Sequence, residues 1–248
     1  MTNENNPLMI EGKNPVWEAL KAGRPMDKLL INKELNQQTI KGLLGLARRS
    51  HVLVDFVPKA KLDTLSETGR HQGLIALLPA AQYTNFHDML DQAFAKSEAP
   101  LIVILDQIQD PYNLGAIIRS AECAGAQGIV IPERRSAGLT AVVARASAGA
   151  IEHVPIAKVK NLSDAIKIMK DRGLWVIGTD SQGSNYHQVD MKGPTAIVIG
   201  NEGDGMRRLT KEACDQLAGI PLQGKVESLN ASVAAGVLLF EVVRQRQQ

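Results

Sequence analysis

Three stretches in the second half of the chain combine polar side chains with small residues directly after apolar runs. The first contains Asn113 and Arg119, and the second is the glycine-rich GNEGDGM around Glu202. The third contains Ser228 and Asn230. Amides, hydroxyls and a carboxylate can orient a ligand through hydrogen bonds, and a guanidinium can bind an anion. The three stretches are therefore candidates for one binding or catalytic site.

Each stretch also has a purely structural interpretation. Asn and Ser are common helix N-caps, so Asn113 or Ser228 alone could serve only that purpose. A single arginine on a helix, such as Arg119, is usually solvated, and small residues can simply let helices pack closely. The combination of the three stretches, more than any single residue, indicates a function.

The glycine-rich stretch matches neither of the common nucleotide-binding loops. Gly200, Gly203 and Gly205 have the spacing G-x-x-G-x-G, whereas the dinucleotide fingerprint is G-x-G-x-x-G. A P-loop needs Lys and then Ser or Thr after its last glycine, but Met206 and Arg207 follow here. Because glycine allows a positive φ and a close approach of the backbone, we expect a ligand loop of another kind. A plain strand-to-helix turn is the alternative.

Apolar runs alternate with amphipathic segments in the second half of the chain, which predicts an α/β domain. Runs such as 101–106 and 195–200 predict buried parallel strands, and segments such as 162–173 predict helices on both faces of the sheet. In such a sheet, ligands bind beyond the carboxyl ends of the strands. The polar stretches are expected there, and Thr179 ends the strand predicted at 174–180.

The first part of the chain has a different sequence pattern. Short apolar and amphipathic segments alternate there, as in a small α/β sandwich. These segments predict helices at 14–23 and 37–50 and strands at 28–32, 52–57 and 73–78. We expect a first domain at 8–80, a linker with one helix at 81–98, and a second domain at 99–248.

Composition and charge indicate an ordinary globular protein. The 248 residues are 44% hydrophobic and 22% charged, and the net charge of +2 does not by itself indicate a nucleic-acid partner. No apolar run approaches the ~20 residues of a membrane helix, and the first residues lack the pattern of a signal peptide. The five histidines and two cysteines show no metal-ligand spacing. We expect a cytoplasmic protein with no metal and no membrane contact.

The order of the three motifs resembles the SpoU (TrmH) family of RNA ribose 2′-O-methyltransferases, in the SPOUT superfamily. The motifs are N-x-G-x-x-x-R from Asn113, G-N-E-G-x-G-M from Gly200, and I-P-x-x-G-x-x-x-S-L-N-x-S-x-A from Ile220. The stretch from IEGKNPVWEALKAG to HQGLIA resembles the small ribosomal-protein-like RNA-binding domain of enzymes that methylate a guanosine of large-subunit rRNA. The resemblance implies an α/β fold in which a parallel-sheet domain with a deep trefoil knot follows a small α/β RNA-binding domain.

The resemblance also implies a cofactor, partners and functional residues. The cofactor would be S-adenosylmethionine, the substrate rRNA, and the assembly a homodimer. The residues implied to contact the cofactor are Thr179, Gly200, Ile220 and Leu229. Those implied to be catalytic are Arg119, Asn113, Glu202, Ser228 and Asn230. Because a guanidinium stays protonated in proteins, we expect a charged Arg119 to hold the target phosphate and stabilise the developing alkoxide.

Three other functions are weighed against this one. A tRNA ribose is an alternative target, although the tRNA enzymes of the family usually lack the N-terminal domain. A ribosome-assembly or RNA-binding factor could keep the fold without catalysis, but the presence of Arg119 and Asn230 favours an enzyme. A nicotinamide-dependent oxidoreductase is disfavoured because the dinucleotide fingerprint is missing.

Overall fold

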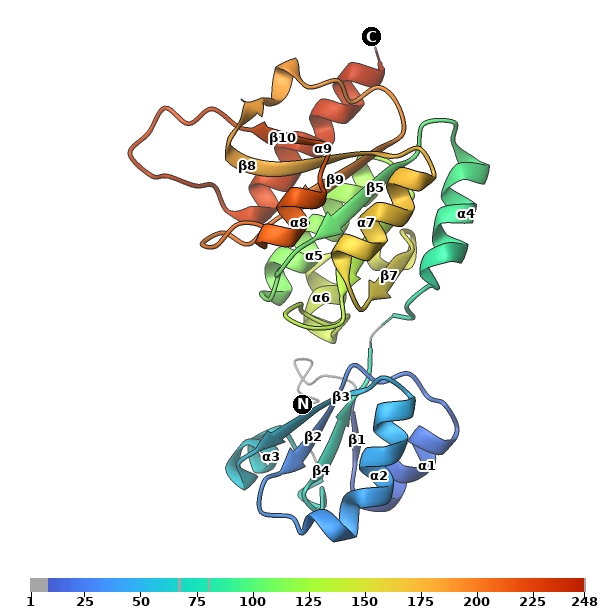
Figure 1. Cartoon of the computed structure of the whole chain (residues 1–248). Helices are drawn as coiled ribbons and strands as arrows, with labels where there is room; N and C mark the ends of the chain where they lie inside the picture. The colour runs from blue at the N-terminus through green and yellow to red at the C-terminus, as the bar shows by residue number, and fades with distance from the viewer. Residues whose placement is uncertain (1–8, 67, 80, 248) are drawn as a thin grey trace. The chain divides into compact units, whose positions relative to one another are not determined.

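The computed structural model describes residues 9–66, 68–79 and 81–247, which form two compact units. The first unit comprises the chain up to Gln82 together with Gly138–Val142, and the second comprises Tyr83–Ala137 and Val143–Gln248. Each unit has its own sheet and its own hydrophobic core (Figure 1). Each is therefore a domain in the structural sense.

The sheet of the first unit has four strands in the order β1-β4-β2-β3, with β2 parallel to β3 and β4 antiparallel to β1 and β2. Its elements are β1 (Met9–Glu11), α1 (Lys13–Lys21), β2 (Lys28–Asn32), α2 (Gln37–Arg49), β3 (Leu53–Val57), α3 (Lys59–Leu65) and β4 (Leu74–Leu77). The small α/β sandwich is thus confirmed. The sequence analysis missed β1 and α3, because elements this short show no clear period.

The alternation of side chains along β2 explains why helices cover both faces of this first sheet. Leu29 and Ile31 are buried in a core shared with α1 and α2. Leu30, which points the other way, is buried with Leu62 of α3 and Ile75 of β4. The strand therefore lies between two helix layers (Figure 1).

The sheet of the second unit has six parallel strands in the order β10-β8-β9-β5-β6-β7. Its strands are β5 (Leu101–Leu105), β6 (Gly128–Pro132), β7 (Ile156–Val159), β8 (Trp175–Asn185), β9 (Thr195–Ile199) and β10 (Gln216–Gly219). Its α-helices are α4 (Phe86–Lys96), α5 (Pro111–Cys123), α7 (Leu162–Asp171), α8 (Arg208–Ala213) and α9 (Ala231–Arg246), together with most of α6 (Ala141–Ala146), whose first two residues are grouped with the first unit. The predicted parallel sheet is confirmed.

Helices cover both faces of the second sheet, which lets its central strands be apolar throughout. Every residue of β5, β6 and β9 is buried. Side chains of α4, α7 and α8 pack into one core cluster with these strands, and α5 and α9 pack against each other on the other face (Figure 1). No helix within the described residues is long and apolar enough to cross a membrane.

Helix α4 lies inside the segment 81–98, which was expected to be a linker. Its residues Phe86, Met89, Leu90 and Ala93 are buried in the core of the second unit. The structure therefore assigns this helix to the second unit. Sequence could not decide this, because an amphipathic pattern is the same whichever core the helix packs against.

Several element boundaries also differ from the sequence analysis. α2 ends at Arg49 and α7 runs from Leu162 to Asp171, so each ends one or two residues before the predicted boundary at 50 or 173. β8 extends to Asn185, so Thr179 lies inside this strand and not at its end.

The last strand, β10, pairs with β8 in two separate segments. Leu217 pairs with Gly178, but the next residue, Ala218, pairs with Ser184. Residues 179–183 therefore bulge out of the pairing, and the backbone of β10 passes very close to them. A Cβ atom on Gly183 would lie 2.7 Å from the carbonyl carbon of Leu217, so only glycine fits. This tight passage is consistent with the knot that the resemblance implies.

A buried carboxylate, Glu241, fixes the C-terminal half of α9. Arg244 donates two hydrogen bonds to it, at 2.8 and 2.7 Å, and Gln245 donates a third at 2.8 Å. The hydrogen bonds from Arg244 lower the pKa of Glu241 to about 2; burial opposes the shift, while Gln245 and His187 add to it. Gln245 also donates to the Val189 carbonyl, so the network connects α9 to the segment after β8.

We predict that Glu241→Gln lowers the free energy of unfolding by roughly 3 kcal/mol near neutral pH, because the lowered pKa reflects tighter holding of the carboxylate in the folded state. This contribution is complete above the ordinary pKa of 4.5 and is lost as the pH falls towards about 2. Denaturant unfolding of both proteins near neutral pH and near pH 3 measures the difference. A difference of the same size at both pH values would contradict the assignment.

Candidate active site

The candidate site lies at the carboxyl ends of β5 and β9, where the connections of the sheet diverge. From β5 the chain continues towards β6, and from β9 it continues through α8 to β10 at the opposite edge. Connections that leave in opposite directions open a crevice, which is the usual ligand position in an open α/β sheet. The two loops meet there, and Asn201 Nδ2 donates to the Gln107 carbonyl at 3.2 Å.

The glycine-rich loop after β9 is a tight turn. Asn201 and Gly205 exchange backbone hydrogen bonds of 3.0 Å, and Asn201 Oδ1 accepts the N–H of Gly203 at 2.9 Å. A Cβ atom on Gly200 would lie 2.5 Å from backbone atoms of Gly205 and Met206. Glycine at position 200 is therefore required by the turn itself, whatever ligand the loop holds.

A buried ion pair that the sequence analysis did not identify fixes the end of this loop. Asp106, fully buried at the end of β5, accepts hydrogen bonds from Arg207 Nε at 2.7 Å and from its backbone N–H at 2.8 Å. A buried charge is costly unless it is paired and hydrogen-bonded. Asp106 therefore holds the loop at Arg207, 101 residues later in the chain. The available signal was an aspartate at the end of an otherwise apolar strand.

Three of the predicted catalytic side chains meet in one hydrogen-bonded cluster. Asn113 Nδ2 donates to Glu202 Oε1 at 2.9 Å. Asn230 Nδ2 donates to Asn113 Oδ1 at 2.9 Å and also to Glu202 Oε1. The backbone N–H of Ala231 donates to the same carboxylate oxygen at 3.1 Å. Among the described residues, Glu202 Oε2 has no hydrogen-bond partner, which leaves it as the open acceptor of the cluster.

Helix capping explains only part of this arrangement. The N-cap of α5 is Asp110, whose side chain accepts two backbone N–H groups, so Asn113 is not a cap. Asn230 is the N-cap of α9, and its Oδ1 accepts two backbone N–H groups while its Nδ2 joins the cluster. Ser228 caps no described helix. Asn230 thus has a structural role, whereas Asn113 owes its position to the cluster.

A cavity of about 460 Å³ is bordered by Glu202 of this cluster and by the start of α9. Its volume is within the range of small-molecule sites, roughly 300–1,000 Å³. It is lined by the bulge of β8, the glycine-rich loop, the segment after β10 and the start of α9. The predicted site residues that line it are Thr179, Gly200, Ile220, Leu229, Glu202 and Ser228.

The charged side chains that line the cavity are carboxylates. They belong to Asp180, Glu202, Asp204 and Glu227, and no Lys or Arg is among the described lining residues. Burial raises the pKa of Asp180, but hydrogen bonds, chiefly from Lys211, bring it below its ordinary value. Asp180 is ion-paired with Lys211, but the other three carboxylates have no ion pair with a described residue and favour a ligand with positive charge. Within the described residues, no group of three or more His, Cys, Asp or Glu is placed to hold a metal ion.

Arg119 is the one predicted catalytic residue that belongs neither to the hydrogen-bonded cluster nor to the described lining of the cavity. It is exposed on α5, six residues after Asn113, so the two side chains point roughly 120° apart around the helix. It does not line the cavity, and its guanidinium has no hydrogen bond or ion pair with any described residue. A single chain therefore does not bring all five predicted catalytic residues together.

Comparisons with known proteins agree with this geometry. The profile of the SpoU rRNA Methylase family matches residues 100–240, and a profile described as RNA 2′-O ribose methyltransferase substrate binding matches residues 9–84. A putative TrmH family tRNA/rRNA methyltransferase, YacO of Bacillus subtilis strain 168, is 47% identical over 238 residues. This match covers 96% of the present chain and 95% of the relative.

Two solved structures are similar over different lengths of the chain. The AdoMet-bound rRNA methyltransferase from Sinorhizobium meliloti has a TM-score of 0.61 and 28% identity, covering 98% of this chain and 88% of that one. The TrmH/SpoU tRNA modifying enzyme of A. aeolicus has a TM-score of 0.56 and 28% identity, covering 65% of this chain and 83% of that one. The chain belongs to the SpoU (TrmH) family of RNA ribose 2′-O-methyltransferases.

Proposed function

We propose that this protein transfers a methyl group from S-adenosylmethionine to the ribose 2′-hydroxyl of a guanosine in 23S rRNA. The observation that carries the proposal is the cluster of Asn113, Glu202 and Asn230 next to a small-molecule cavity. The cluster leaves Glu202 Oε2 as an open acceptor for a hydroxyl substrate, and the cavity offers carboxylates to a cationic cofactor.

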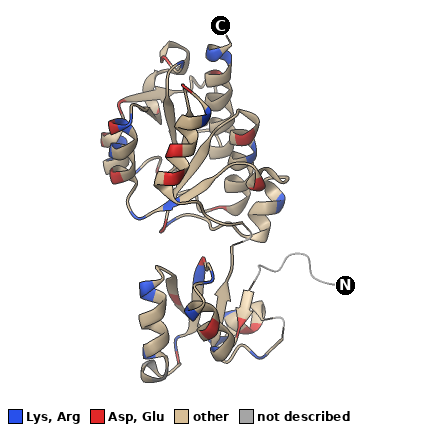
Figure 2. Cartoon of the chain, turned by 90° about the vertical axis from the view of Figure 1, so that its right-hand side faces the viewer, with Lys and Arg blue, Asp and Glu red and all other residues tan. Residues whose placement is uncertain are grey.

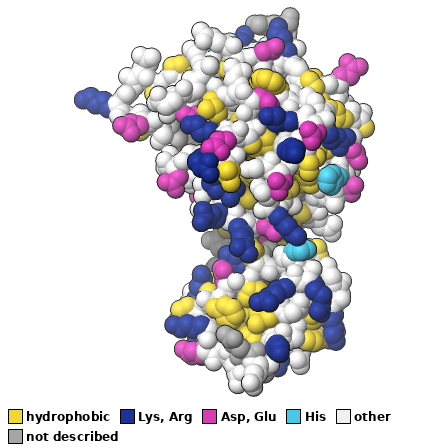
Figure 3. Space-filling view, in the orientation of Figure 1, with side chains coloured by type: hydrophobic (Ala, Val, Ile, Leu, Met, Phe, Trp, Pro, Cys, Tyr) yellow, Lys and Arg dark blue, Asp and Glu magenta, His cyan; other side chains and the backbone are white. Residues whose placement is uncertain are grey.

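The first unit supports rRNA over tRNA as the substrate. The S. meliloti rRNA methyltransferase matches nearly the whole chain, whereas the A. aeolicus tRNA enzyme matches only 65% of it. Charges of both signs are distributed over both units, so net charge does not identify an RNA surface (Figure 2). On the face of the lower, N-terminal unit seen in Figure 3, however, Lys and Arg predominate over Asp and Glu. Such a face is suited to contacts with phosphates.

The cavity of the second unit fits the cofactor. S-adenosylmethionine supplies a methyl group on a positively charged sulfonium sulfur. Thr179, Gly200, Ile220 and Leu229 would hold the cofactor, since all four line the cavity. The carboxylates around it complement the positive charge.

Side chains of this protein would orient the ribose and stabilise the negative charge that develops on its 2′-oxygen. Glu202 Oε1, through its three hydrogen bonds, fixes the two amides and the first turn of α9, so these groups need no reorganisation during the reaction. Ser228 lines the cavity beside them and can position the ribose. A charged Arg119 at about 4 Å from a developing alkoxide is worth roughly 4 kcal/mol at an effective dielectric of about 20.

A homodimer would explain why Arg119 is exposed in a single chain. α5 and α9 pack against each other, and both have exposed apolar side chains: Tyr112 is 68% exposed, Val233 51% and Phe240 50%. Exposed apolar groups on neighbouring helices are suited to an interface with another protein. If a second copy packs on this face, Arg119 lies in the interface, where it can serve an active site that a single chain leaves incomplete.

The cofactor assignment can be tested with Ala234→Leu. Ala234 lines the cavity from α9, so the larger side chain should occupy ligand space and weaken S-adenosylmethionine binding about tenfold or more. Val233→Leu, on the neighbouring exposed position, is the control and should bind normally. Titration calorimetry of the three proteins measures the affinities. Equal affinities would place the cofactor elsewhere.

The role of Arg119 can be tested with Arg119→Lys, which we expect to lower the single-turnover methylation rate about a thousandfold, nearly as much as Arg119→Ala. Lysine keeps the charge but loses the planar fork that can grip a phosphate while facing the ribose oxygen. Cofactor affinity should change little. A lysine variant with nearly normal rate would show that Arg119 only attracts RNA through its charge.

Deletion of residues 1–82 tests the contribution of the first unit. Helix α4 is retained because it belongs to the core of the second unit, so the truncated protein should still bind S-adenosylmethionine. Its kcat/KM on rRNA should fall by roughly a hundredfold, because RNA would no longer be held by a linked binding domain. Equal values for the full and truncated proteins would refute a substrate-binding role for this unit.

A further inference from the structure

A buried ion pair between Asp106 and Arg207 joins the end of β5 to the end of the glycine-rich loop. The Asp106 side chain is fully buried, whereas that of Arg207 is 38% exposed. Replacing a buried ion pair by apolar residues of similar volume is often neutral or stabilising, because taking charges out of water is costly. Stability alone therefore explains poorly why a carboxylate directly follows the apolar strand β5.

Asp106 and the residue after it hold both ends of the glycine-rich loop. At the first end, the N–H of Asp106 donates to the Ile199 carbonyl at 2.8 Å, and Asn201 Nδ2 donates to the Gln107 carbonyl at 3.2 Å. At the second end, the Asp106 carboxylate accepts hydrogen bonds from the backbone N–H of Arg207 at 2.8 Å and from its Nε at 2.7 Å. The position of the loop relative to β5 is therefore set from both sides.

The backbone of Gln107 supports the same contact between the two loops. Its φ is 64°, in the left-handed region that residues other than glycine seldom adopt. Such conformations have an energetic cost and persist where the surrounding structure imposes them, often at functional sites. Here the turn places the Gln107 carbonyl where the Asn201 side chain can donate to it.

The two loops carry side chains of the catalytic cluster. The segment after Asp106 leads into α5, which bears Asn113, and Glu202 lies between the two held ends of the glycine-rich loop. Asn113 Nδ2 donates to Glu202 Oε1 at 2.9 Å from one loop to the other. This hydrogen bond and the direction of Glu202 Oε2 both depend on the relative position of the loops, which the ion pair helps to set.

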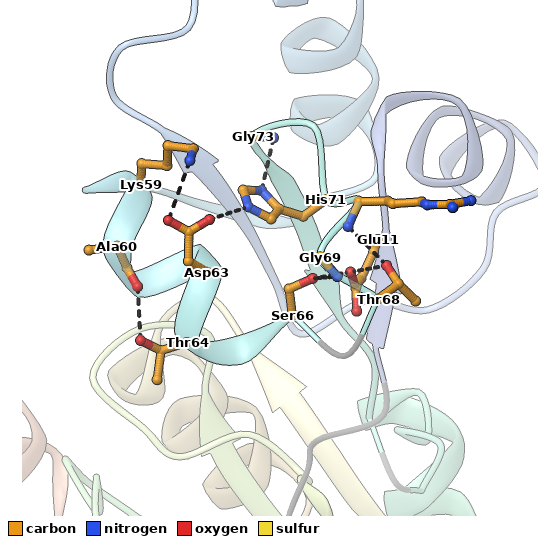
Figure 4. Close-up of polar contacts among 11 residues, drawn as sticks. Glu11, Lys59, Ala60, Asp63, Thr64, Ser66, Thr68, Gly69, His71 and Gly73 are labelled. Carbon is orange, nitrogen blue, oxygen red and sulfur yellow. Dashed lines mark hydrogen bonds and ion pairs between the residues drawn. The ribbon is translucent and has the colours of Figure 1, made fainter.

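A hydrogen-bonded carboxylate in the first unit has a more local role. His71, which is buried, is hydrogen-bonded through Nε2 to Asp63 Oδ1 at 2.9 Å, and Lys59 is ion-paired with the same carboxylate at 3.5 Å (Figure 4). These three residues lie close in sequence and connect α3 to the loop that follows it. Asp106 and Arg207 are 101 residues apart, and they connect two loops that both carry motif side chains.

We propose that Asp106 and Arg207 are positioning residues for methyl transfer. They hold the glycine-rich loop so that Glu202 meets both Asn113 and the ribose hydroxyl in the reactive geometry. Neither side chain is among the described residues that line the cavity, so both act through Glu202 without touching the cofactor. The proposal rests on methyl transfer to RNA, the proposed function, but not on which RNA is the substrate.

Single-turnover methyl transfer by the full-length protein, at saturating S-adenosylmethionine and RNA, tests the proposal. Asp106→Asn and Arg207→Gln should each lower the rate about a hundredfold, the effect of displacing reacting groups by about 1 Å. Arg207→Lys should recover part of this loss, because an ammonium can still pair with Asp106. Cofactor affinity, measured by titration calorimetry, should change little. If Asp106→Asn does not fold, the comparison of the two variants at the half-exposed Arg207 decides.

Two control variants separate positioning from stability. Arg208→Gln breaks the exposed ion pair with Glu212 on α8 and should transfer methyl groups at the normal rate. Glu241→Gln removes a buried carboxylate elsewhere in the unit, so it should unfold more easily but react normally well below its unfolding temperature. Normal rates in Asp106→Asn and Arg207→Gln, or an equal loss in Glu241→Gln, would overturn the proposal.

A loss in Arg207→Gln with a normal rate in Asp106→Asn would also overturn the proposal, because the guanidinium would then act on the RNA directly. Total rRNA and total tRNA, from cells that lack the gene, are used in parallel so that target sites are unmethylated. Transfer to tRNA alone would refute the proposed rRNA substrate. The variants would then be compared on tRNA, so the positioning role is tested independently of the substrate.

Discussion

The second unit depends on close contact between backbone segments that leave no space for a Cβ atom. Gly200 lies against the backbone of residues 205–206, and Gly183 lies against that of 217–218. Any side chain at these positions would separate the segments, and the same segments form walls of the cavity. The cavity is therefore bordered by closely packed backbone, which gives the rigidity that a preorganised ligand site requires.

Charge pairing extends this constraint to the side chains of the cluster. The buried Asp106 holds Arg207 at the end of the glycine-rich loop, and the same loop carries Glu202. Glu202 in turn positions two amides, and one of them, on Asn230, also caps α9. The loop, α5 and α9 therefore meet at one carboxylate oxygen. Asn230 therefore has both a structural role, as the N-cap of α9, and a role in the cluster, so helix capping alone does not explain its position.

The two units each have a cavity, and the cavities differ in chemical character. The cavity of the second unit is lined by carboxylates such as Asp204 and Glu227, which suit a cationic ligand. The cavity of the first unit, of about 390 Å³ between β1, the start of α1 and the loop 68–72, offers donors from Asn14, Arg70 and Gln72, which suit the acceptor-rich surface of a nucleic acid. The two linings therefore differ in charge within one chain whose net charge is +2.

Local sequence patterns were sufficient to predict a parallel sheet, most of the helices, and the edge of the sheet where Asn113, Glu202 and Asn230 meet. These features could be predicted because hydrophobic periodicity and the ends of strands depend on residues that are neighbours in sequence. The motifs were sufficient for the family. Only the tertiary structure showed that α4 belongs to the second core and that Arg119 does not line the cavity. It also decided why position 200 must be glycine and what Asp106 binds, since both depend on backbone or side chains that folding brings together and that no local pattern contains.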